Sequence, residues 1–329
     1  MNKDIKNYIH NMPKIDLHCH IDGSFSINYI KKTLGINTSD EELSKKLTAP
    51  YDCSSLAEYL TCFDLPIQCM QTKETITDGI LDIIHQCHEE NIAYVELRFA
   101  PSCSINDAMT YRDVFEAAIA GTKKGFTQYG VKSNIIACAM RHHSYEDNAA
   151  MLKSAREFLG LGVCALDLAG DEKSHGNEEF AELFSYARRL NMPFTIHSGE
   201  CGSVNNVRLA MEYGAKRVGH GIALIQDEKA IAECKSYHLG LELCPTSNYQ
   251  THAVKPDCFY PLRSFLDAGL AATINTDNRT VSSTTLSAEY ELVCDKYGIT
   301  ENDFEVLYKN SVDISFADDN TKNELLKLI

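Results

Sequence analysis

Two histidines separated by one residue, His18 and His20, close a short apolar stretch near the N-terminus in the sequence KIDLHCHIDGS. Side chains at positions i and i+2 of a β-strand point to the same face, so the two imidazoles could bind one object together. Imidazole nitrogens suit a borderline-soft divalent metal, zinc first. The pair alone is a weak signal, because a histidine at the end of a strand is often only a polar residue at a rim.

Further groups of the same kind follow other apolar runs. His197 opens HSGE, with Glu200 three residues later, His220 lies in VGHGI, and Asp277 lies in INTDN. A metal held by such residues would lower the pKa of a bound water to about 7 and supply hydroxide. Glu200 could donate a proton, and His220 could orient or deprotonate the water. The residue chemistry therefore indicates metal-assisted hydrolysis without fixing a substrate.

These groups need a scaffold that brings them together. Eight short apolar runs alternate with segments of helical periodicity. The runs are Ile15–His20, Ala93–Phe99, Asn134–Met140, Val163–Leu168, Phe194–His197, Arg217–His220, Gly240–Leu243 and Ala271–Asn275. Repeated strand–helix alternation predicts a (β/α)₈ barrel, in which the C-terminal ends of all strands meet at one face. A doubly wound sheet is the alternative, but no Gly-rich dinucleotide turn follows the first strand.

The domain organisation follows from the segment lengths. Residues 25–75 are too long for a single crossover and predict a helical insertion after the first strand, a lid over the barrel mouth. No linker or repeat interrupts residues 1–329, which predicts a single domain. The other histidines, His142, His143 and His175 among them, are predicted to be surface or packing residues, with some reserve for His142.

Composition excludes several classes of protein. The formal charge is 31 − 46 = −15 and no basic run occurs, which disfavours nucleic acid and anionic membranes as partners. Thirteen cysteines, an odd number without a C-x-x-C pair, predict reduced thiols in a cytoplasmic protein, since MNKDIKN has no apolar signal region. The motifs H-E-x-x-H, G-x-S-x-G, G-K-[ST] and P-C-x-x-C are absent from the sequence.

The chain resembles the adenosine/AMP deaminase family of metal-dependent amidohydrolases. The resemblance runs through nearly the whole sequence, in order, in the segments DLHCHIDGS, YVELRFAP, MRH, LDLAGDE, IHSGE, VGHGI, LCPTSNYQT and INTDN. It implies hydrolytic deamination of adenosine, and of 2′-deoxyadenosine, by a zinc-activated hydroxide that attacks purine C6. The products would be inosine or deoxyinosine and ammonia.

The resemblance also implies roles for particular residues. One zinc ion per chain would be held by four ligands, His18, His20, His197 and Asp277. Glu200 would donate a proton to purine N1, and His220 would be the partner of the zinc-bound hydroxide. Glu200 must then be protonated at working pH, so we expect burial to raise its pKa, whereas Asp277 should stay ionised beside the cation.

Four residues are implied on the substrate side: His20, Asp22, Gly170 and Asn278. The Gly170 backbone would contact purine N3, and Asp22 the ribose 5′-hydroxyl. The family often reads Asp-Asp-Pro where this chain reads Asp277-Asn278-Arg279. The second aspartate is the usual contact to purine N7, and an asparagine amide donates at any pH, so Asn278 is predicted to keep that contact. The alternative is that Asn278 only caps the turn after the last strand.

Other functions stay open at this point. Adenine deaminases usually carry glutamate where this chain has Asp22, and the shorter side chain leaves room for a ribose. Dinuclear amidohydrolases often carry a lysine at the end of the fourth strand, where this chain reads Asp167-Leu168-Ala169-Gly170, so one metal is predicted. Another purine aminohydrolase, or a non-catalytic zinc-containing nucleoside-binding protein, are the remaining alternatives. The chain is expected to be a monomer or a homodimer.

Overall fold

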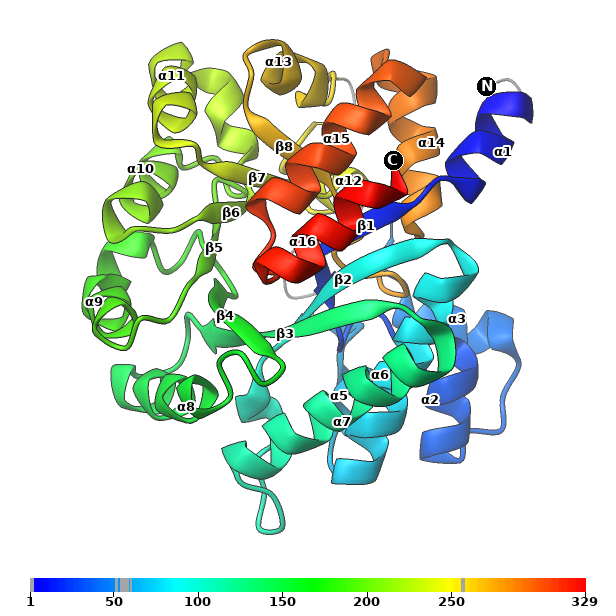
Figure 1. Ribbon diagram of the computed structural model, residues 1–329. Coiled ribbons are helices and arrows are strands. Elements are labelled where there is room, and N and C mark those ends of the chain that lie inside the picture. The colour runs from blue at the N-terminus through cyan, green and yellow to red at the C-terminus, as the bar shows by residue number, and fades with distance from the viewer. Residues whose placement is uncertain (1–2, 51–52, 54–58, 60, 256–257) are drawn as a thin grey trace.

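The computed structural model describes residues 3–50, 53, 59, 61–255 and 258–329. Its parallel strands form a ring enclosed by helices, as Figure 1 shows. The strands are β1 (Lys14–His20), β2 (Ile92–Phe99), β3 (Lys132–Met140), β4 (Val163–Ala169), β5 (Thr195–Ser198), β6 (Arg217–His220), β7 (Gly240–Leu243) and β8 (Ala271–Ile274). The predicted (β/α)₈ barrel is confirmed, and each predicted strand is present.

The ring consists of two hydrogen-bonded runs, β1 to β4 and β5 to β8. A bridge between Leu166 and Phe194 joins β4 to β5, and a bridge between Cys19 and Asp277 joins β1 to the end of β8. At the second junction, which we call the seam, the Asp277 amide donates to the His18 carbonyl and the His20 amide donates to the Asp277 carbonyl, both at 2.7 Å. The backbone of Asp277 therefore closes the barrel between the two histidines of β1.

Helices follow the strands around the outside. Those before β5 are α1 (Lys3–Asn11), α2 (Ile27–Leu34), α3 (Asp40–Leu47), α5 (Asp64–Gln68), α6 (Lys73–Glu89), η1 (Pro101–Ser104), α7 (Tyr111–Tyr129), α8 (Tyr145–Glu157), η2 (Asn177–Phe180) and α9 (Ala181–Arg189). Those after it are α10 (Val204–Tyr213), η3 (Ile222–Gln226), α11 (Glu228–Tyr237), α12 (Pro245–Gln250), α13 (Leu262–Asp267), α14 (Leu286–Tyr297), α15 (Glu301–Ile314), α16 (Asp319–Leu325) and η4 (Leu326–Leu328).

The apolar pattern explains how the helices pack. In α6, Ile76, Ile80 and Ile83 recur at helical spacing and are fully buried. The neighbouring α7 places Gly121 against Ile80, where an added Cβ would lie 2.8 Å from the isoleucine Cβ. The glycine therefore lets the two helices approach closely. No helix in the described part of the chain is long and apolar enough to cross a membrane.

The two ends of the barrel are closed differently. Helices α15 and α16 lie across the N-terminal end, where Tyr308, Val312 and Leu325 pack against Ile15 and Leu17 of β1. In Figure 1 these helices lie in front of the strands, so the viewer looks at that end. The C-terminal ends of the strands border the cavity described below. Residues 25–75 contain α2, α3 and α5, and their role as a lid stays a prediction.

Candidate active site

Four of the predicted residues converge at the C-terminal ends of β1, β5 and β8. The Nε2 atom of His20 lies 3.3 Å from Nε2 of His18 and 3.2 Å from Nε2 of His197. Oδ1 of Asp277 lies 3.4 Å from Nε2 of both His18 and His20. Ligands at the roughly 2.0–2.1 Å of zinc–nitrogen bonds, arranged as a tetrahedron, lie about 3.3 Å apart. These four separations therefore fit atoms that bind one small divalent metal.

Two further donors border this cluster. His220 lies with His18 and His197, and Cys244 with His18 and Asp277, in groups whose ligand atoms are within 4.8 Å of one another. Burial, with the negative charge of Asp277 beside it, raises the pKa of the Cys244 thiol well above its usual range, so the sulfur keeps its proton. The four atoms with tetrahedral spacing are the better ligand set, and His220 is left as a neighbour of the metal position.

Carboxylates behind the histidines fix which nitrogen faces the cluster. His18 Nδ1 lies 2.7 Å from Oε2 of Glu242, and His197 Nδ1 lies 3.0 Å from Oδ2 of Asp167. Each Nδ1–H donates outward to a carboxylate, so each Nε2 presents a lone pair inward, as metal-binding histidines do. The Arg98 guanidinium joins both carboxylates, at 2.9 Å from Asp167 and 2.7 Å from Glu242. One buried cation thus connects the supports of two ligands.

The backbone is strained where two of the site residues leave their strands. Asp277 has φ 60° and His220 has φ 66°, in the left-handed region that side-chain-bearing residues rarely adopt. Burial opposes ionisation of Asp277, but the surrounding histidines, His18 first, outweigh it and hold the pKa of Asp277 well below its usual range. This direction agrees with the expectation that Asp277 is ionised, which stays a prediction.

Glu200 and His220 lie together beside the metal position. Oε2 of Glu200 is 3.6 Å from Nε2 of His220, and Thr251 donates to Oε1 of Glu200 at 3.0 Å. Burial lowers the pKa of His220 to about 4, so the ring is neutral at pH 7. The Asn248 amide nitrogen lies 3.0 Å from His220 Nδ1 and donates to it, which places the ring proton on Nε2. This geometry favours an orienting role for His220 over proton abstraction. The role of Glu200 as the proton donor stays a prediction.

A cavity of about 350 Å³ opens over these groups. It is lined by His20, Asp22, Gly170 and Asn278, all four predicted on the substrate side, together with the apolar side chains Phe63, Ile67, Met140 and others. Oδ1 of Asp22 is buried and has no hydrogen-bond partner among the described residues, so it is available to accept a hydrogen bond from a ligand. Gly170 has φ 105°, so the backbone there turns in a way that a side chain would hinder.

The amide of Asn278 is already engaged in the described structure. Its Nδ2 donates to Oδ1 of Asp277 at 2.8 Å and to the Tyr59 hydroxyl at 3.0 Å, and its Oδ1 faces Gly23. Both amide hydrogens thus have partners, so donation to purine N7 would need one of them to turn. The neighbouring Arg279 forms a buried ion pair with Glu90 on the outer side.

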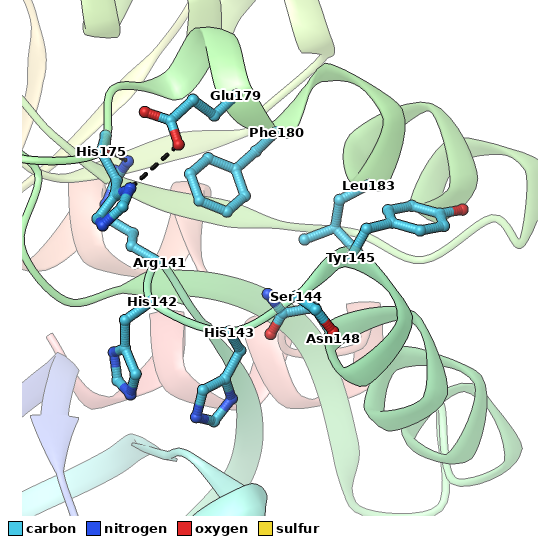
Figure 2. A pocket seen from close by; sticks show the side chains of 10 residues that line it. All are labelled: Arg141, His142, His143, Ser144, Tyr145, Asn148, His175, Glu179, Phe180 and Leu183. Carbon is cyan, nitrogen blue, oxygen red and sulfur yellow. Dashed lines mark hydrogen bonds and ion pairs between the residues drawn. The ribbon is translucent and has the colours of Figure 1, made fainter.

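A second pocket, of about 360 Å³, lies next to this cavity and is shown in Figure 2. His142 lines both, while His143 belongs to the second pocket alone. His175 pairs there with Glu179 at 3.0 Å, the dashed line in Figure 2. Among the described residues, the groups spaced to hold a metal do not include any of these three histidines. His142 therefore lies at the rim of the site, apart from the ligand cluster.

The sequence patterns missed the residues that support the site. Arg98, Asp167 and Glu242 are charged residues inside otherwise apolar strands, a signal that such residues pair with one another. Thr251 lies in the segment LCPTSNYQT, where its spacing from other polar residues gives no indication of a contact with Glu200. Tyr59 belongs to the inserted segment and contacts Asn278 of the site, a contact between residues far apart in the sequence.

Comparison with known proteins identifies close relatives. A family model described as adenosine deaminase matches residues 13–329. An adenosine deaminase of Enterococcus faecalis is 38% identical over 322 residues, which cover 96% of each chain. An adenosine deaminase of Vibrio atlanticus is 37% identical over 324 residues, 97% of this chain and 98% of that protein.

Solved structures share the fold. An amidohydrolase of Burkholderia ambifaria with bound zinc superimposes with a TM-score of 0.88 at 19% identity, covering 100% of this chain and 94% of that one. An adenine deaminase of Arthrobacter aurescens gives a TM-score of 0.84 at 22% identity, covering 96% of this chain and 97% of that one. At these identities the likeness concerns the fold alone.

Proposed function

This chain belongs to the adenosine deaminase family, and we propose that its cavity hydrolyses adenosine, and 2′-deoxyadenosine, to inosine or deoxyinosine and ammonia. The observation that carries the proposal is the position of Glu200, beside His220 and over the four converging ligand atoms. An aromatic amine leaves only after C6 has become tetrahedral, which requires a nucleophile and a proton on the ring. A proton donor next to a metal position meets both requirements.

His18, His20, His197 and Asp277 would hold one divalent ion, which we take to be zinc. When bound, that ion would supply an activated water at neutral pH. The donor set supports this assignment, since the Nε2 lone pairs of His18 and His197 point inward and the Asp277 carboxylate is ionised. These are the protonation states that metal binding requires.

The proton-transfer steps belong to Glu200 and His220. Glu200 donates its proton to purine N1, which makes C6 electrophilic. The Nε2–H of neutral His220 donates to the attacking oxygen and orients it. Water adds to C6, the bond from C6 to the amine breaks, and the amine leaves as ammonia. One proton of the consumed water returns to the Glu200 carboxylate, which gave its own proton to N1. The other water proton joins the leaving amine to form ammonia.

The substrate contacts follow from the lining of the cavity. Asp22, whose Oδ1 accepts no hydrogen bond from the described residues, would accept one from the ribose 5′-hydroxyl. The Gly170 amide would contact purine N3, and His20 would border the ring at the metal position. Asn278 would donate to N7, giving up its hydrogen bond to Tyr59 for one to the ring.

Side-by-side assays with adenosine, adenine and AMP test the proposal, with ultraviolet absorbance reporting loss of the 6-amino chromophore and metal analysis of the same sample. We expect turnover of adenosine, little turnover of adenine or AMP, and one metal ion per chain. Preference for adenine would identify an adenine deaminase. Nucleoside binding without turnover by metal-loaded protein would identify a binding protein. The His197→Ala variant is the control, because it lacks one ligand and should lose both metal and activity.

A further inference from the structure

A buried carboxylate, that of Glu172, lies directly behind the loop that carries Glu200. Glu172 follows β4 and is only 4% exposed. Its Oε1 accepts hydrogen bonds from the Gly199 amide at 2.6 Å and from Asn206 Nδ2 at 2.8 Å, and its Oε2 accepts one from the Cys201 amide at 2.9 Å. Among the described residues, no cation lies within ion-pair distance of it. These three N–H donors therefore compensate the cost of burying the charge.

The two backbone donors flank Glu200. Each oxygen of one planar carboxylate holds one of them, so the peptide plane between residues 198 and 199 and the plane between residues 200 and 201 are fixed with respect to each other. Gly199 has φ 77°, and an added Cβ there would lie 2.9 Å from Val207 Cγ2. The loop is thus held in a conformation that most residues would not adopt. We call the two hydrogen bonds from these backbone amides to Glu172 the clamp. The clamp sets the direction in which the Glu200 side chain leaves the backbone.

The far end of Glu200 is held more loosely. From the described residues its carboxylate accepts one hydrogen bond, donated by Thr251; it lies 3.6 Å from His220, and the side chain is 21% exposed. The position of a proton donor at N1 must be accurate to well under 1 Å for efficient transfer. With so few contacts on the side chain, the backbone clamp by Glu172 has to supply that accuracy.

The clamp is tied to the same framework as the metal ligands. Asn206, the third donor to Glu172, accepts a hydrogen bond from the Asn177 amide at 3.1 Å. Asn177 Oδ1 accepts from Arg141 at 2.8 Å, and the same Arg141 nitrogen donates to the His197 carbonyl at 2.6 Å. Figure 2 shows Arg141 extending toward the His175 loop. A continuous polar chain thus connects the Glu200 loop to a metal ligand.

We propose that Glu172 is the positioning residue of Glu200, which it holds by binding the backbone amides on both sides of it. The inference rests on the proposed function, in which Glu200 protonates N1. Because N1 is protonated on the way to the transition state, loosening the clamp should lower kcat and leave KM nearly unchanged.

The test compares Glu172→Gln in the wild-type chain and in the Glu200→Gln chain. Glutamine keeps the shape but replaces one acceptor oxygen with an NH₂ group, so one backbone amide faces a donor. In the wild-type background we expect kcat for adenosine to fall about 10- to 100-fold, with KM changed less than about threefold. In the Glu200→Gln background, where no acid is left to position, the same change should cost less than about twofold.

Three measurements keep the outcome unambiguous. The matched control is Asp82→Asn, which alters a partly buried carboxylate that also accepts a hydrogen bond from a backbone amide, that of Ser26 at 2.8 Å, away from the site. It should leave kcat unchanged. Metal content and melting temperature of the Glu172 variants should match the wild type. If Glu172→Gln does not fold, Glu172→Asp, too short to reach both amides, takes its place.

Some outcomes contradict the proposal. An equal loss in both backgrounds, or a loss no larger than that of Asp82→Asn, would overturn the positioning role. A parallel loss of metal would overturn it too, because the effect would then not pass through Glu200. Failure of the proposed function looks different: the wild-type protein itself, loaded with metal, would not deaminate adenosine.

Discussion

Replacing Arg98 with methionine should destabilise the protein and weaken metal binding together. The guanidinium is fully buried and bonds to Asp167 at 2.9 Å, to Glu242 at 2.7 Å and to the Leu17 carbonyl at 2.6 Å. Burial opposes its charge, but Glu242 and Asp167 outweigh that effect and raise the pKa of Arg98. Without it, two buried carboxylates lose their shared cation. Breaking a buried pair costs about 3–5 kcal/mol, and we expect a loss of that size in the free energy of unfolding.

The assay is urea unfolding of the chelator-treated protein, followed by titration with zinc. Because Asp167 and Glu242 orient His197 and His18, we expect the affinity for the metal to fall about 10- to 100-fold. Arg98→Lys keeps the charge but cannot bond to both carboxylates, so its effects should be intermediate.

A matched control is available on the surface. Arg208 also bonds to two carboxylates, Asp227 at 2.8 Å and Glu233 at 2.7 Å, but its side chain is 35% exposed. Arg208→Met should therefore destabilise the protein far less than Arg98→Met and leave the zinc affinity unchanged. Equal destabilisation by Arg98→Met and Arg208→Met, or unchanged zinc affinity in Arg98→Met, would refute the reasoning.

Four further predictions address other parts of the molecule. Glu200→Gln should keep the fold and the metal but lose roughly 10²–10⁴-fold in kcat, and a loss below about tenfold would mean that another group protonates the ring. AMP should be a much poorer substrate than adenosine, because its phosphate would meet the partly buried Asp22 carboxylate; equal kcat/KM values would contradict this pose. 7-Deazaadenosine, which lacks N7, should bind the transition state about 1 kcal/mol less well than adenosine, since the Asn278 amide can return to Tyr59, and Asn278→Ala should abolish the difference. Burial raises the pKa of Glu289 from 4.5 to about 7, against the hydrogen bonds that it accepts, so the folded state keeps a proton that the unfolded chain has lost. The free energy of unfolding should therefore fall as pH rises from 4.5 to about 7. Glu289→Gln should remove up to about 3 kcal/mol of that fall, measured by urea unfolding at several pH values.

The sequence patterns were informative where function depends on local geometry. The spacing of His18 and His20 predicts a shared face, and the C-terminal ends of parallel strands bring Asp277 and His197 to the same place. The buried charged residues behind the histidines, Arg98, Asp167 and Glu242, could not be predicted in this way. Which buried charge meets which is set by the stagger between strands, and apolar periodicity carries no information about that stagger.

Contacts made by irregular segments were also out of reach. Thr251 reaches Glu200 from the turn after α12, and Tyr59 reaches Asn278 from the inserted segment. Glu172 stood in a quoted motif, yet its role depends on amides that carry no side-chain signature. The sequence therefore indicates which groups react, while the groups that hold them emerge from the folded backbone.

The seam between β1 and the end of β8 has a consequence for how the chain acquires its metal during synthesis. Three proposed ligands, His18, His20 and Asp277, meet there, and they come from opposite ends of the polypeptide. A ribosome will have exposed the two histidines long before Asp277 is made. A nascent or prematurely terminated chain therefore offers only a partial, weak site. Tight uptake of the proposed metal would then require that the first and last strands have joined, so a bound ion would report closure of the barrel.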